Sequence, residues 1–144
     1  MPTHFEVVDR CNVECTRYDL LFSEGRVPKP DAIKIDSQGY EYEILQGFGG
    51  LLQGCLGIEL EAHFYKLYRE QKLLHKLIEL LDSYDLVLRR LNPVPHFGGD
   101  LVEVDAYFTK RRQSVMNLSA IQRSKFDLLT DIWELPKYQL PKHR

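Results

Sequence analysis

The spacing at which hydrophobic residues recur changes along this chain, and each spacing predicts a different element of secondary structure. Short apolar, β-branched runs are typical of buried strands, and they occur at residues 5–8, 32–36, 56–62, 85–91 and 101–108. Apolar residues at intervals of three and four predict an amphipathic helix over residues 73–81. Other segments predict a brief helix or turn at 16–22, a helix at 40–52 and an amphipathic helix around 126–133.

The order of these elements predicts an α/β fold. Strands that alternate with helices favour a mostly parallel sheet that is covered by helices. The last two strands are joined only by the turn-rich segment 92–99, so we expect them to form a terminal antiparallel hairpin. The helix around 126–133 is expected to dock on this domain or on a partner.

Composition and charge indicate one folded domain with a basic tail. Of the 144 residues, 44% are hydrophobic and 28% are charged, which is typical of a domain with one core. The net charge of −2 does not favour nucleic acid as a partner. Residues 1–109 carry 11 basic and 18 acidic side chains, which gives a net charge of −7. Residues 110–144 carry 8 basic and 3 acidic side chains, which gives a net charge of +5. We therefore divide the chain into a domain at 1–112 and a tail at 113–144.

Neither a membrane span nor a cysteine-based site is expected. No run of about 18 apolar residues is present, and the first residues lack the pattern of a signal peptide. These features predict a cytoplasmic protein. The three cysteines, Cys11, Cys15 and Cys55, do not have the paired spacing of a disulfide framework or a zinc site.

The first group of candidate site residues follows the strand at 32–36. In an open α/β sheet, ligands bind outside the carboxyl ends of the strands. Asp36 ends this strand, Gly39 permits a tight turn, and Glu41 begins the next helix. The same spacing also fits a structural role, in which Asp36 or Ser37 caps the helix and Glu41 favours its positive end. Spacing alone leaves both interpretations open.

The second group lies on the strand at 56–62 and just beyond it. Glu59, Glu61 and His63 alternate along the chain and therefore share one face of the sheet. Two carboxylates and an imidazole can hydrogen-bond a substrate or cofactor, or bind a metal, or form an ordinary polar face. Because the spacing matches no known ligand pattern, we expect hydrogen bonding rather than a metal site.

A longer motif carries a resemblance to a known family. Residues 30–47, PDAIKIDSQGYEYEILQG, resemble the hallmark segment of FkbM-type methyltransferases, in which a strand ending in Lys-Ile-Asp leads into Gln-Gly-x-Glu and then Leu-x-Gly. Further similarities follow in the family's order, at 58–61, at Tyr68 with Gln71, and at 104–108. The resemblance covers roughly residues 4–110.

The resemblance implies a fold, a cofactor and an activity. Similar proteins have a class I methyltransferase fold, Rossmann-like, with a seven-stranded sheet whose last strand is antiparallel. They use S-adenosylmethionine, and the implied reaction is O-methylation of a hydroxyl-bearing small molecule or glycan. On this basis Asp36 is the expected catalytic residue, and the expected cofactor contacts are Asp36, Gln38 and Gly39. The expected acceptor contacts are Glu41, Glu59, Glu61 and His63.

The resemblance also implies that part of the enzyme is absent. The similarity begins near the third or fourth strand of such a sheet, so the chain is expected to be the C-terminal half of a methyltransferase. The resemblance leaves open whether this half is active or inactive alone. An alternative is a non-catalytic binding or assembly module that self-associates through an exposed sheet edge. A metal-dependent hydrolase built on Glu59, Glu61 and His63 is the weakest hypothesis.

Overall fold

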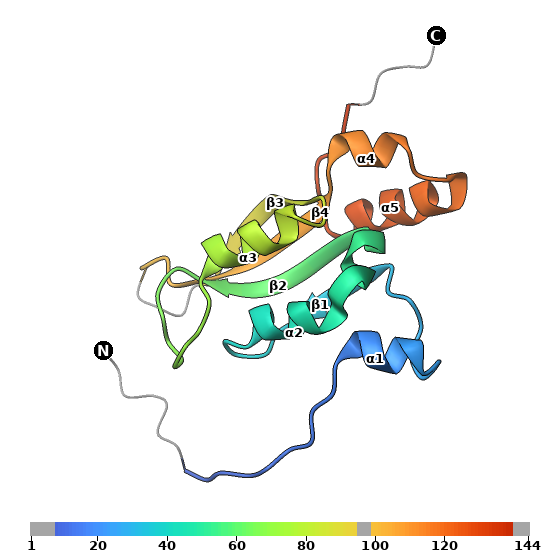
Figure 1. Cartoon of the computed structure of the whole chain (residues 1–144). Helices are drawn as coiled ribbons and strands as arrows, with labels where there is room; N and C mark the ends of the chain where they lie inside the picture. The colour runs from blue at the N-terminus through green and yellow to red at the C-terminus, as the bar shows by residue number, and fades with distance from the viewer. Residues whose placement is uncertain (1–7, 95–98, 140–144) are drawn as a thin grey trace.

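The computed structural model describes residues 8–94 and 99–139 and contains a four-stranded sheet (Figure 1). Its strands are β1 (Ala32–Ile35), β2 (Gly57–His63), β3 (Leu86–Pro93) and β4 (Glu103–Lys110), in the order β1-β2-β4-β3. Four of the five expected strands are therefore present. The remaining one, at 5–8, falls outside the described residues apart from Val8.

The sheet is mixed. β1 and β2 are parallel, whereas β4 is antiparallel to both of its neighbours, β2 and β3. The expected terminal hairpin is thus confirmed, and the α/β class with it. The expectation of a mostly parallel sheet is not confirmed, since the described strands form only one parallel pair. The reason is that the hairpin folds back and inserts β4 between β2 and β3.

Three helices and a 3₁₀ turn precede the last two strands. They are α1 (Tyr18–Ser23), α2 (Glu41–Phe48), η1 (Gly49–Gly54) and α3 (Leu74–Asp82). Alternate β2 residues pack with α2, η1 and α3 in the main core, whose buried side chains include Ile58, Leu60, Leu45, Leu52 and Leu77. The polar β2 positions point to the opposite face, as the alternation predicts.

The expected helix at 40–52 is divided in the structure. α2 ends at Phe48, and Gly49 has a φ of 52°, so the chain continues as a 3₁₀ turn. A Cβ at Gly49 would lie 2.8 Å from Asp19 Oδ2. A uniform helix prediction fails here because Gly49 adopts a left-handed backbone conformation that interrupts the helix.

The tail folds back onto the sheet, as expected for the helix around 126–133. It forms α4 (Arg112–Met116) and α5 (Ala120–Ile132), and α5 begins with a capping box between Ser119 and Gln122. Trp133 packs edge-on against Tyr107 of β4, with ring centroids 5.5 Å apart. Figure 1 shows that α4 and α5 gather near the start of β2. They leave the carboxyl ends of β1 and β2 uncovered.

In the described part of the chain, no helix is both long enough and apolar enough to cross a membrane.

Candidate active site

The carboxyl ends of β1 and β2 bring the two groups of candidate residues together. The parallel register pairs Ile35 with Leu60, which places the residues that follow each strand side by side. The Gln38 side-chain amide donates hydrogen bonds to Asp36 Oδ1 at 3.1 Å and to Glu61 Oε1 at 3.1 Å. Asp36, Gln38 and Glu61 therefore form one hydrogen-bonded network at the edge where open α/β sheets bind ligands.

The turn after β1 requires glycine at position 39. Gly39 has a φ of 102°, a backbone conformation that side-chain-bearing residues rarely adopt. A Cβ at this position would lie 2.5 Å from Tyr68 Cδ2. The turn and the Tyr68 ring are thus in close contact, and the Tyr68 hydroxyl donates a hydrogen bond to Gln38 Oε1.

Glu41 shapes this turn from the first position of α2. Its carboxylate accepts hydrogen bonds from the Ser37 backbone N–H at 3.0 Å and from the Gly39 backbone N–H at 3.1 Å. Glu41 is 2% exposed, so these internal contacts occupy its carboxylate. Contact with an acceptor stays a prediction for this residue.

The structural alternative for the first group is wrong about capping by Asp36 or Ser37, whereas Glu41 does lie at the N-terminal end of α2, as it stated. The N-cap of α2 is Tyr40, and no side chain makes a cap hydrogen bond there. Asp36 instead is exposed and contacts Gln38. Ser37 donates its hydroxyl to Glu41, also at 3.0 Å. Asp36 is thus available to a ligand rather than occupied at the helix terminus.

Tyr68 is held by the loop between β2 and α3. The buried Gln71 accepts hydrogen bonds from the backbone N–H groups of Leu67, at 2.9 Å, and Tyr68, at 3.2 Å. This explains why Tyr68 and Gln71 stand together in the motif. The loop positions the tyrosine ring over the turn at Gly39.

A buried cluster lies next to this network and contains a residue that the sequence did not suggest. His63 Nε2 lies 3.2 Å from Glu103 Oε2 and 3.7 Å from Glu61 Oε1. Glu103 comes from β4, where the antiparallel register pairs it with His63. The acidic residues Glu103 and Asp105 alternate along β4, but only the pairing with β2 identifies which of them meets the histidine.

The electrostatics of this cluster are dominated by carboxylates. The pKa of Glu61 is raised from 4.5 to about 7, mainly by burial and in smaller part by the nearby charges of Glu103, Asp36, Glu41 and Asp105. Burial and the same kind of neighbours also raise the pKa of the Tyr68 hydroxyl. Within residues 8–94 and 99–139, neither Glu61 nor Glu103 forms an ion pair with a lysine or arginine.

Glu59 lies outside the cluster. Its carboxylate forms an ion pair with Lys34 on the neighbouring strand, with Lys34 Nζ 2.6 Å from Glu59 Oε1. The hydrogen bond to Glu59 raises the pKa of Lys34. The structure thus unites Glu61 and His63, but not Glu59, with the network around Asp36. Contact between Glu59 and an acceptor stays a prediction.

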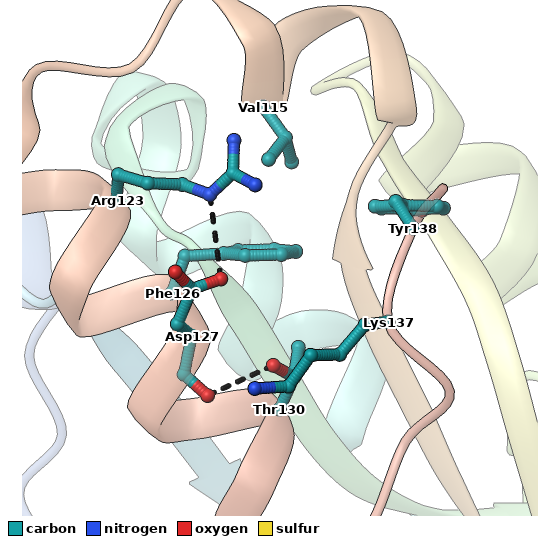
Figure 2. Close-up of a pocket in the computed structure, with 7 residues that line it drawn as sticks. All are labelled: Val115, Arg123, Phe126, Asp127, Thr130, Lys137 and Tyr138. Atoms are coloured by element: carbon teal, nitrogen blue, oxygen red, sulfur yellow. Dashed lines mark hydrogen bonds and ion pairs between the residues drawn. The ribbon is translucent and has the colours of Figure 1, made fainter. Parts of the chain in front are cut away.

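A pocket in the tail does not include any of the expected site residues. Figure 2 shows it between α4, α5 and the segment that follows α5, lined by Val115, Arg123, Phe126, Asp127, Thr130, Lys137 and Tyr138. The Arg123 guanidinium is paired with Asp127 at 3.3 Å. The candidate site therefore remains the region at the ends of β1 and β2.

Comparison with known proteins identifies the family. The model of the methyltransferase FkbM domain matches residues 1–88, more than half of the chain. The chain belongs to the FkbM methyltransferase family. The FkbM domain match includes β1, β2 and every expected site residue, whereas Glu103 lies beyond it.

The chain is also similar to a curated protein that is named as a methyltransferase. The chain is 34% identical over 79 residues to the hexuronic acid methyltransferase AglP of Haloferax volcanii. This similarity covers 50% of the chain but 33% of AglP, so the chain matches about a third of the length of this relative. No solved structure matches the chain.

Proposed function

We propose that this chain forms part of an S-adenosylmethionine-dependent methyltransferase that methylates a hydroxyl oxygen of a small molecule or glycan. Membership of the FkbM methyltransferase family supports methyl transfer. The observation that carries the proposal is the network of Asp36, Gln38 and Glu61 at the carboxyl ends of two parallel strands. That position is where open α/β sheets bind their ligands.

The residues at this edge suit the methyl-donating end of the cofactor. S-adenosylmethionine supplies an electrophilic methyl group on a positively charged sulfur. Asp36 and Gln38 are exposed at the strand end, and the surrounding carboxylates make the electrostatic potential of the region negative. A cation is stabilised by such a neighbourhood. Asp36, Gln38 and the Gly39 turn are therefore the groups that would hold the cofactor in this part of the protein.

The protein's contribution to the reaction is positioning and proton removal. Methyl transfer requires the acceptor oxygen to be aligned with the methyl group and to lose its proton. Asp36 is exposed and accepts a hydrogen bond from Gln38, so its carboxylate can also accept a hydrogen bond from an acceptor hydroxyl. Gln38 is oriented in turn by Glu61 and by the Tyr68 hydroxyl.

A sugar hydroxyl is the acceptor that we propose to test first. The name of AglP specifies a hexuronic acid, and hydroxyl groups suit a site rich in hydrogen-bond acceptors. An acid group on the sugar would meet the carboxylates of this site and be repelled. A panel of neutral sugars and uronic acids therefore tests both the reaction and the charge preference.

The decisive experiment measures transfer of an isotope-labelled methyl group from S-adenosylmethionine to this panel, followed by mass spectrometry of the sugars. Because the chain matches a third of its relative, the assay uses the longest gene product that contains it. Asp36→Asn should lower the rate by about 10²–10⁴-fold, whereas Asp82→Asn on the exposed end of α3 should not. Absence of methyl transfer from the complete protein to any hydroxyl acceptor would overturn the proposal.

A second candidate function rests on the free edge of the sheet. Among the described strands, β1 pairs only with β2, so its other edge offers unpaired backbone groups. Such an edge readily pairs with another chain, which favours a binding or assembly module. Gel filtration with light scattering distinguishes this function, because a monomer at every concentration would contradict self-association through β1.

A further inference from the structure

We propose that Glu61, His63 and Glu103 bind one divalent transition-metal cation. One potential ligand atom from each of these three side chains lies within 4.8 Å of the other two. The residues come from two paired strands, β2 and β4, so the rigid sheet fixes their relative positions. The site differs from the triad expected from sequence, because Glu103 takes the place of Glu59. It does not depend on methyl transfer.

The distances suit a small cation. Tetrahedral zinc has ligand bonds of about 2.0–2.1 Å, which separate neighbouring ligand atoms by about 3.3 Å. His63 Nε2 lies 3.2 Å from Glu103 Oε2 and 3.7 Å from Glu61 Oε1. The two histidine–carboxylate separations are therefore within a few tenths of an ångström of this value, and the ligand atoms of Glu61 and Glu103 lie within 4.8 Å of each other.

Burial makes an uncompensated cluster unfavourable. His63 is 1% exposed, and the Glu61 and Glu103 side chains are 10% and 13% exposed. Buried charges are normally paired or bound to metal ions, and the described residues provide no lysine or arginine partner for either carboxylate. A divalent cation would neutralise both carboxylates at once.

The histidine provides an independent observation. His63 Nε2 points at the two carboxylates, while its buried Nδ1 has no hydrogen-bond partner among the described groups. The contacts of Nε2 alone therefore set the direction of the His63 ring. Nε2 is the atom that a cation held between the two carboxylates would bind.

The ligand set indicates the class of cation. One imidazole nitrogen with two carboxylate oxygens suits zinc or manganese. Cu(I) prefers sulfur ligands, and calcium and magnesium prefer oxygen ligands alone. Three protein ligands leave at least one coordination position for water or for an acceptor hydroxyl, as in catalytic zinc sites. A cation here would also reduce the repulsion of acidic acceptors.

Calorimetric titration of the chelator-stripped protein with zinc chloride tests the proposal. The titration uses a Cys11→Ser, Cys15→Ser background, because these two thiols are exposed and cysteine sulfur is itself a zinc ligand. We expect one equivalent of zinc per chain. Glu103→Gln should weaken binding by at least the 10–100-fold that loss of an outer-shell partner costs. Glu79→Gln, on the exposed face of α3, should leave it unchanged.

A second readout separates metal binding from folding. Zinc should raise the melting temperature of the parent protein, because a ligand that binds the native state stabilises it, and should not do so for Glu103→Gln. If Glu103→Gln does not fold, Glu61→Gln gives the same comparison. Absence of stoichiometric zinc, or equal affinity in the Glu103→Gln and Glu79→Gln proteins, would overturn the site. Methyl transfer could still succeed in that case, so the two proposals fail separately.

Discussion

Gly39 is the residue at which backbone geometry and the candidate site are most closely linked. Its positive φ forms the turn, and the absence of a side chain admits the Tyr68 ring that contacts Gln38. Glu41 then fixes the turn through the backbone N–H groups of Ser37 and Gly39. The position of Gln38 between Asp36 and Glu61 is a consequence of these contacts.

Gly39→Ala should therefore destabilise the protein by about 1–3 kcal/mol, through backbone strain and the contact with Tyr68. Urea unfolding followed by circular dichroism measures the change. Gly50→Ala is the matched control, because nothing lies within 4 Å of a Cβ at that position and its φ is not in the left-handed region. We expect a change within about 0.5 kcal/mol for the control. Equal urea midpoints of unfolding for the two variants would contradict this account of the turn.

The raised pKa of Glu61 predicts a pH dependence of stability in the metal-free protein. The native state keeps this carboxyl protonated up to about pH 7, whereas the unfolded state releases the proton near pH 4.5. Stability is therefore lost as pH rises from about 4.5 through 7, since the native state binds more protons in this window. At pH 8 the loss in the free energy of unfolding is on the order of 3 kcal/mol.

Glu61→Gln should remove this loss of stability. In the presence of chelator, we expect the variant to be more stable than the parent at pH 8 and to approach it near pH 4.5. Urea unfolding at several pH values measures the difference. Glu79→Gln, which removes a carboxylate whose pKa is lowered by Lys76, should not show this gain. A constant difference between Glu61→Gln and the parent across the pH range would refute the assignment.

At the scale of elements, α5 is joined to the sheet through its last turn. Trp133 packs on Tyr107, and a Cβ on Gly57 of β2 would lie 2.6 Å from Trp133 Cζ3. Gly57 is thus required for the close approach of the tail. The neighbouring Ile132 is 66% exposed, so the two consecutive residues have opposite environments.

Trp133→Ala should accordingly cost about 3–5 kcal/mol of stability, a large part of the total for an ordinary domain. Ile132→Ala is the matched control on the same helix turn and should change stability by no more than about 0.5 kcal/mol. Thermal unfolding by calorimetry compares them. If the two substitutions have similar effects, α5 does not contribute to the folded domain as we describe.

Local patterns predicted the elements better than their arrangement. The apolar runs located β1 to β4, and the spacing of leucines located α3, because both depend on burial of one face. The helix at 40–52 was predicted too long, since it was continued through Gly49, whose left-handed backbone conformation ends α2 at Phe48. The order of the strands depends on where the hairpin inserts.

At the scale of the whole molecule, the candidate site is made by strand pairing. Asp36, Gln38, Gly39 and Glu61 could be identified from sequence because they follow strands or belong to a family motif. Glu103 could not, because its meeting with His63 depends on β4 lying between β2 and β3. The same arrangement leaves the far edge of β1 unpaired among the described strands.

The extent of the sheet leads to a final prediction about the cofactor. In the class I fold that the family implies, the first strands and their loops hold most of S-adenosylmethionine, and this sequence contains no GxGxxG turn. In the function that we propose, the described residues of this chain that would hold the cofactor are Asp36, Gln38 and Gly39. We expect the 144-residue chain to bind S-adenosylhomocysteine no more tightly than about millimolar, equivalent to roughly 4 kcal/mol.

Calorimetric titration with S-adenosylhomocysteine makes the measurement, and the longest gene product that contains this chain is the matched control. Micromolar affinity in the longer protein with millimolar affinity in the chain would locate about half of the binding free energy outside residues 1–144. Micromolar affinity in the chain itself would contradict the prediction. In that case the carboxylates and backbone groups at the ends of β1 and β2 would have to supply about 8 kcal/mol without further strands.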